Sequence, residues 1–60
     1  MNKRDGIIKV RYIGVDGKAE GDLILNKVYD VLSIEDGWYR IVDESGDDYI
    51  YPPTIFVSLD

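Results

Sequence analysis

The sequence leaves almost no room for helices. Glycine, proline and β-branched or aromatic residues interrupt every window of the 60-residue chain that is long enough for a stable helix. Between these interruptions lie short apolar runs, several of which alternate with polar residues at a period of two. Short runs separated by turn-rich stretches are typical of a small barrel or sandwich. We therefore expect a single all-β domain.

Five short segments have strand character. In the first, residues 7–13, Val10 and Tyr12 alternate with Lys9 and Arg11, which predicts one apolar and one basic face. The other four segments are residues 28–34, 38–42, 49–51 and 57–59. Residues 1–6 are polar and are expected to form a flexible segment ahead of a domain spanning residues 7–60.

Turn-rich stretches separate these segments. The longest, Gly14 to Asp22, carries three glycines and three acids and predicts a long loop, followed by a short apolar piece at 23–25. Pro52 and Pro53 end the fourth segment because neither can donate to a strand ladder. Residues 53–56 are then expected to make one turn of 3-10 helix. Shorter turns are expected at residues 26–27, 35–37 and 43–48.

The residue inventory limits the chemistry. The chain has neither cysteine nor histidine, so a disulfide, a Ser-His pair and a Cys-His pair are all impossible. Residues 43–48 superficially resemble a calcium loop but lack its ligand spacing and terminal glutamate. For the paired acids Asp47 and Asp48 to act as catalysts, a pocket would have to raise the pKa of one of their carboxyl groups. We expect no enzyme activity, no metal and no cofactor.

The net charge is −5 at pH 7. Phosphate binding depends on clustered Lys and Arg, so this balance argues against nucleic acid and against an anionic membrane surface. No apolar run reaches the length of a membrane span, and residues 1–6 do not resemble a signal peptide. The expected location is the cytoplasm.

The order of these segments resembles an SH3 domain. Residues 27–32, Lys-Val-Tyr-Asp-Val-Leu, are similar to the family segment that leads into the n-Src loop. Residues 36–39 resemble the Gly-Trp-aromatic motif after that loop, and residues 51–56 resemble the aromatic-Pro-Ser-Asn-Tyr-Val segment. Upstream, residues 10–14 and 22–25 stand at the positions of the Ala-Leu-Tyr-Asp-Tyr and Glu-Leu-Ser-Phe motifs. The resemblance, which extends to small stand-alone SH3-like proteins of prokaryotes, implies a five-stranded SH3-like barrel with a 3-10 turn before the last strand.

The same resemblance implies a peptide groove. Tyr12, Trp38 and Pro52 match its tyrosine, tryptophan and proline, whereas Gly14 and Ile55 stand where the family has two further tyrosines. Losing two phenol rings weakens the recognition of proline-rich segments, so a basic or apolar segment is the expected ligand. The family also holds a ligand Arg or Lys with loop acids. The matching acids here are Asp16, Glu20, Asp22, Glu35 and Asp36.

Each assignment has a competing interpretation. The five acids would pair with a cation beside the Trp38 indole, or they are simply solvated. Alternation places Trp38 on the other face of its strand from Tyr39 and Ile41, which predicts a partly exposed indole. The competing interpretation is that a single tryptophan is commonly a core residue. Tyr12 continues the inward face of its strand, which favours core packing with an exposed hydroxyl over a place in the groove.

These observations favour a non-catalytic interaction module that binds a protein or peptide segment around Trp38. The alternative is a structural or self-associating protein, because exposed strand edges of two copies can pair and Trp38 with Val42 would form an apolar patch. The expected oligomeric state is a monomer or a weak homodimer. A third hypothesis is a nucleic-acid-binding barrel, which the net charge disfavours.

Overall fold

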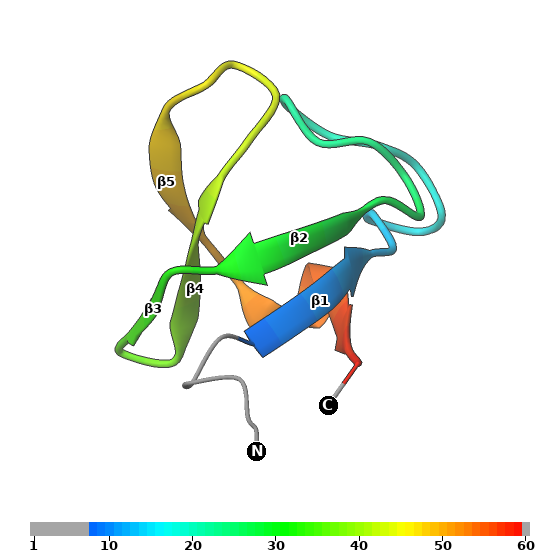
Figure 1. Ribbon diagram of the computed structural model, residues 1–60. Helices are drawn as coiled ribbons and strands as arrows, with labels where there is room; N and C mark the ends of the chain where they lie inside the picture. Colours follow the sequence, from blue (N-terminus) through cyan, green and yellow to red (C-terminus); the bar gives the residue numbers. More distant parts are fainter. Residues whose placement is uncertain (1–7, 60) are drawn as a thin grey trace.

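Strands provide nearly all the regular structure of the part of the chain that is described. The structure is a computed structural model that describes residues 8–59. Its elements, in chain order, are β1 (Ile8–Tyr12), β2 (Val28–Val31), β3 (Ser33–Glu35), β4 (Trp38–Val42), β5 (Asp48–Tyr51), the 3-10 turn η1 (Pro53–Ile55) and β6 (Phe56–Ser58) (Figure 1). The prediction of an all-β fold with a 3-10 turn before the last strand is confirmed. The segment 1–6 that was expected to be flexible lies outside the described residues.

The strands form two antiparallel sheets of three. Sheet I has the order β2-β1-β6 and sheet II the order β3-β4-β5. Across residues 8–59 the pairing gives six strands in two three-stranded sheets, where the sequence predicted a five-stranded SH3-like barrel. The extra strand arises at Leu32, where the predicted strand 28–34 passes from sheet I to sheet II. Val31 pairs with Ile8, whereas the Leu32 N–H already donates to the Arg40 carbonyl of β4.

Positive φ angles fix the two hairpin turns of sheet II. Asp36 and Gly37 join β3 to β4 with φ of 53° and 82°, the pair of left-handed residues that a two-residue type I′ turn needs. Gly46, in the β4–β5 loop, has φ of 91°. The hairpin predicted for residues 43–48 is therefore confirmed, although β5 begins one residue earlier than expected.

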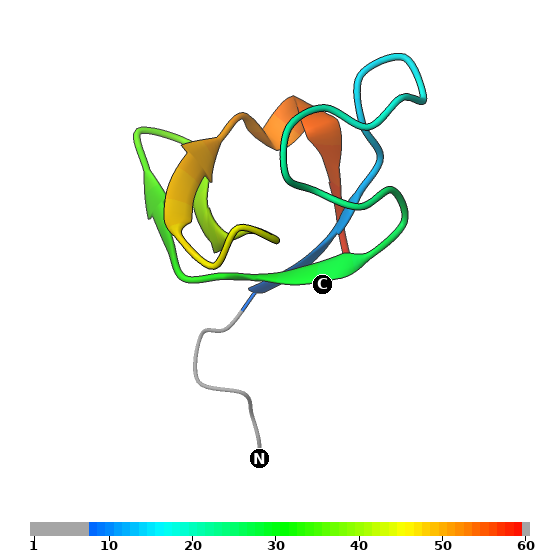
Figure 2. The ribbon, with the colours of Figure 1, turned by 90° about the horizontal axis from the view of Figure 1, so that it is seen from above.

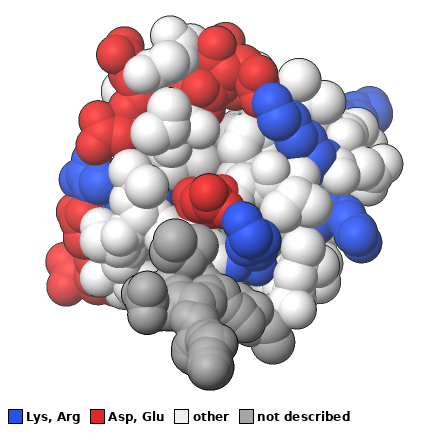
Figure 3. Space-filling view, in the orientation of Figure 1, with Lys and Arg blue, Asp and Glu red and all other residues white. Residues whose placement is uncertain are grey.

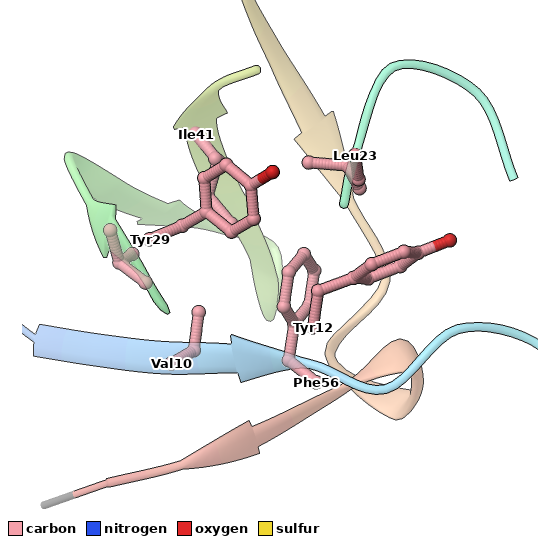
Figure 4. Close-up of a cluster of buried hydrophobic side chains, with 7 residues drawn as sticks. Val10, Tyr12, Leu23, Tyr29, Ile41 and Phe56 are labelled. Atoms are coloured by element: carbon pink, nitrogen blue, oxygen red, sulfur yellow. The ribbon is translucent and has the colours of Figure 1, made fainter. Parts of the chain in front are cut away.

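One core fills the space between the sheets. Its buried residues are Val10, Tyr12, Leu23, Tyr29, Val31, Ile41 and Phe56, most of which are drawn in Figure 4. Phe56 lies among three tyrosine rings, with centroid distances of 5.6 Å to Tyr12, 5.9 Å to Tyr39 and 6.3 Å to Tyr51. The tilted and edge-on packing of these rings adds to the stability gained from their burial.

The long loop, residues 13–27, is anchored without a strand of its own. Residues 23–25, predicted as a short apolar piece, form no strand, but Leu23 is 4% exposed and fills the core from the loop (Figure 4). The main-chain carbonyl of Asp22 accepts a hydrogen bond from the Glu44 N–H. The loop is thereby tied to the β4–β5 loop, on the side of the molecule away from the β3–β4 turn (Figures 1 and 2).

Candidate interaction surfaces

Trp38 stands on the outer face of sheet II. Along β4, Ile41 is fully buried and Tyr39 half-buried, whereas Trp38 is 42% and Val42 44% exposed. This alternation follows from the pleat of the strand, which sends successive side chains to opposite faces. The predicted exposure of the indole is confirmed.

Cross-strand pairing completes this face. Glu35 lies opposite Trp38, Ile50 lies opposite Arg40, and directly paired residues share a face of the sheet. By the same register, the Trp38 face comprises Ser33, Glu35, Trp38, Arg40, Val42, Asp48 and Ile50. Trp38, Val42 and Ile50 are its exposed apolar members, and they surround a charged centre.

Arg40 links all three strands of that face. Its Nη2 donates to Glu35 Oε1 at 2.8 Å, its Nε donates to the other oxygen of the same carboxylate, and its Nη1 donates to Asp48 Oδ2 at 3.2 Å. Hydrogen bonds from Arg40, and then from Ser33, lower the pKa of Glu35 to about 2. Glu35 therefore stays ionised but is already engaged. Two acids and one arginine leave the face with a net charge of −1.

The five predicted acids do not gather beside Trp38. Glu35 is its cross-strand neighbour and Asp36 is exposed in the adjoining turn, as the sequence predicted. Asp16, Glu20 and Asp22 belong instead to the 13–27 loop, which lies on the other side of the molecule (Figures 1 and 2). The expectation of one acidic cluster around the indole is wrong, because this loop folds toward the β4–β5 loop.

Tyr12 belongs to the core. Its side chain has no exposed surface, and its hydroxyl accepts a hydrogen bond from the Glu20 N–H at 2.7 Å and donates to the Glu20 carbonyl at 3.2 Å. Core packing is confirmed, whereas the exposed hydroxyl and the place in a groove are wrong. The phenol instead satisfies main-chain groups of the loop, as a buried polar group must.

The two departures from the SH3 pattern have different local settings. Gly14 has φ of 77°, and a Cβ there would lie 2.3 Å from the Lys18 carbonyl oxygen, so no tyrosine fits at this position. Ile55 is half-buried and packs against the core. Pro52, also half-buried, directly follows β5, whose last residue Tyr51 pairs with Tyr39, the neighbour of Trp38 in β4. Of the three predicted groove residues, Tyr12 is removed from any surface by its burial, whereas Trp38 is exposed and Pro52 half-buried.

A shallow groove was missed by the sequence reasoning. It has a volume of about 490 Å³, runs along β2 and is lined by Lys9, Lys27, Val28, Tyr29, Asp30, Leu32, Val42, Asp43 and Glu44. The Glu44 carboxylate accepts hydrogen bonds from Lys27 Nζ at 2.6 Å and from the Tyr29 hydroxyl at 2.7 Å. Burial, and then the bond to Glu44, raises the pKa of Tyr29 to about 12. No sequence signal joins Glu44 to a tyrosine 15 residues away.

Asp43, at the start of the β4–β5 loop, has structural partners. The Asp43 carboxylate accepts hydrogen bonds from the Ser45 N–H, the Ser45 hydroxyl and the Tyr51 hydroxyl. Asp43 therefore caps its own turn in the manner of an Asx-turn. Within residues 8–59 no three acids are grouped as metal ligands.

Helices that cross a membrane need about 20 apolar residues, and no helix within residues 8–59 is long and apolar enough to do so. Comparison with protein-family models, with curated proteins and with solved structures gives no match for this chain.

Proposed function

We propose that this protein is a small non-catalytic interaction module, of SH3-like barrel type, that binds a protein or peptide segment through the Trp38 face. One observation carries the proposal: a tryptophan that is 42% exposed on a regular strand, with Val42 and Ile50 exposed on the same face. Tryptophan is enriched among the residues that dominate binding energy at interfaces. Exposed apolar side chains that share one face of a sheet, as these three do, support an interaction site there.

The charge of the face suggests the chemistry of the ligand. Arg40 is held by Glu35 and Asp48, so the face presents a rigid charged centre with a net charge of −1 between its apolar residues. Asp36 adds a further exposed acid at its end. A segment that carries apolar side chains and one or two lysines or arginines complements this arrangement.

Two further parts of the proposal concern fold and location. The arrangement of two three-stranded antiparallel sheets, with a 3-10 turn before the last strand, supports an SH3-like relationship. The proposed location is the cytoplasm. A chain without cysteine forms no disulfide and so does not depend on an oxidising compartment.

An NMR titration with pools of basic and of proline-rich peptides tests the binding proposal. We expect the amide signals of β4 and the β3–β4 turn to shift with the basic pool, and Trp38→Ala to abolish these shifts. Tyr49→Ala is the matched control, because Tyr49 is 51% exposed but lies on the opposite face of sheet II. Shifts that survive in Trp38→Ala, or that are confined to other surfaces, would reject the Trp38 face as the binding site.

A further inference from the structure

The outer face of sheet I is a second exposed surface, of different chemistry. Its register places Lys9 beside Asp30 and places Arg11 between Val28 and Val57. We call these five residues the Arg11 face. Val28 is 41% and Val57 45% exposed, so the arginine stands between two exposed apolar side chains.

The charges of the Arg11 face are only partly neutralised. Lys9 Nζ donates to Asp30 Oδ1 at 2.6 Å. Arg11 faces a valine on each side, and in the described part of the chain no carboxylate pairs with it. Two cations and one acid give this face a net charge of +1, on a chain whose total is −5.

The two outer faces are therefore complementary. Each is the outer surface of a three-stranded sheet with exposed apolar residues around a charged centre, and their net charges are +1 and −1. In Figure 3, acidic side chains gather at the top, over the β4–β5 loop, whereas over β1 and β2 basic side chains stand among uncharged residues and beside one acidic side chain. At the left edge of the same view, over sheet II, a basic side chain is flanked by acidic ones.

We propose that the partner of the Trp38 face is the Arg11 face of a second copy of this chain. This inference rests on the proposed function and names its partner. Stacking of the two sheets would bring the Arg11 guanidinium toward the carboxylates of Glu35 and Asp48. The valines beside Arg11 would then pack against the apolar residues of the Trp38 face, as the inner faces of stacked sheets do.

Such a contact joins two different patches, so each bound pair leaves one Trp38 face and one Arg11 face open. Contacts of this heterologous type form chains or rings, whereas a two-fold contact stops at the dimer. Because each copy carries a charge of −5, the copies repel one another and the interface is weak. Association is therefore expected only at high protein concentration.

Sedimentation of the full chain up to about 1 mM, a concentration that populates weak interfaces, tests this directly. We expect the average mass of the wild type to rise steadily with concentration and to pass that of a dimer. Arg11→Glu and Trp38→Ala should each remain monomeric. Lys18→Glu, which makes the same change of charge in the exposed tip of the 13–27 loop, should associate like the wild type.

Mixing the two blocked variants gives the sharpest result. Arg11→Glu retains an intact Trp38 face and Trp38→Ala retains an intact Arg11 face, so an equimolar mixture should form one-to-one dimers and nothing larger. A mixture that stays monomeric would overturn the inference, as would equal losses in Arg11→Glu and Lys18→Glu, or a wild type that remains monomeric. A monomeric wild type whose β4 amides still shift with basic peptides would overturn this inference alone and leave the proposed function standing.

Discussion

Tyr51 donates a hydrogen bond to the buried carboxylate of Asp43, eight residues earlier in the chain. The two residues lie on either side of the β4–β5 loop, and Asp43 is only 6% exposed. Hydrogen bonds from Ser45, and then from Tyr51, lower the pKa of Asp43, so the carboxylate stays ionised inside the turn. Burial, and then Asp43, raises the pKa of Tyr51. This pair holds the loop closed at the end of sheet II.

Tyr51→Phe should therefore destabilise the protein by about 1–3 kcal/mol, because it leaves a buried carboxylate short of one donor. Urea denaturation followed by tryptophan fluorescence measures the loss. Tyr49→Phe is the control, since Tyr49 is 51% exposed, and it should change the stability by less than about 0.5 kcal/mol. Equal losses in the two variants would show that the bond to Asp43 contributes nothing specific.

Glu35 should titrate far below an ordinary glutamate. Its pKa of about 2 depends first on Arg40. Because the folded pKa is depressed, the stabilisation is present above the unfolded pKa of about 4.3 and is lost as the pH falls toward 2. Arg40→Gln should return the carboxyl pKa toward about 4.3, measured by NMR titration of the side chain. Lys27→Gln, which removes a distant cation, should leave it unchanged; a shift there would mean that general charge, rather than Arg40, sets the pKa.

Gly14→Ala should be among the most damaging single substitutions. The new Cβ would meet the Lys18 carbonyl oxygen at 2.3 Å and the Leu25 side chain at 2.7 Å, in addition to the strain of a φ of 77°. We expect a loss of about 2–4 kcal/mol, or failure to fold. Gly46→Ala separates the two causes, because its φ is 91° but no atom lies within 4 Å of the added carbon. It should cost only about 1 kcal/mol, and thermal unfolding of the pair gives the comparison.

Trp38→Ala should cost less than about 1 kcal/mol, because the indole is part of the solvent-facing surface of sheet II. Ile41→Ala, three residues along the same strand, should cost about 2–5 kcal/mol, because that side chain is fully buried and its removal leaves a cavity. Denaturation by guanidinium followed by circular dichroism compares the two. A loss for Trp38→Ala as large as that for Ile41→Ala would assign the indole to the core.

The period of two in the sequence was enough to predict the buried face of the strands at residues 7–13 and 38–42. Val10, Tyr12 and Ile41 all point inward as expected, because successive side chains of a half-buried strand point alternately to the core and to solvent. The 3-10 turn was equally local, since two successive prolines decide it.

Features that depend on distant contacts were not predictable in this way. The path of the 13–27 loop is set by Leu23 in the core and by the bonds of Glu20 to Tyr12 and of Asp22 to Glu44. None of these partners is marked by spacing or composition. The predicted acidic cluster failed for this reason, whereas the neighbours Glu35 and Trp38 were brought together by a two-residue turn that the sequence does encode.

The passage of the chain through Leu32 has a consequence for how this protein unfolds. Residues 28–35 supply one edge strand to each sheet, β2 to sheet I and β3 to sheet II, with a single residue between the two strands. Detachment of β2 from sheet I would therefore displace β3 in sheet II, and the reverse also holds. Both sheets also share the core around Phe56. We therefore expect residues 8–59 to unfold as one unit, so heat and denaturant should each produce one sharp transition.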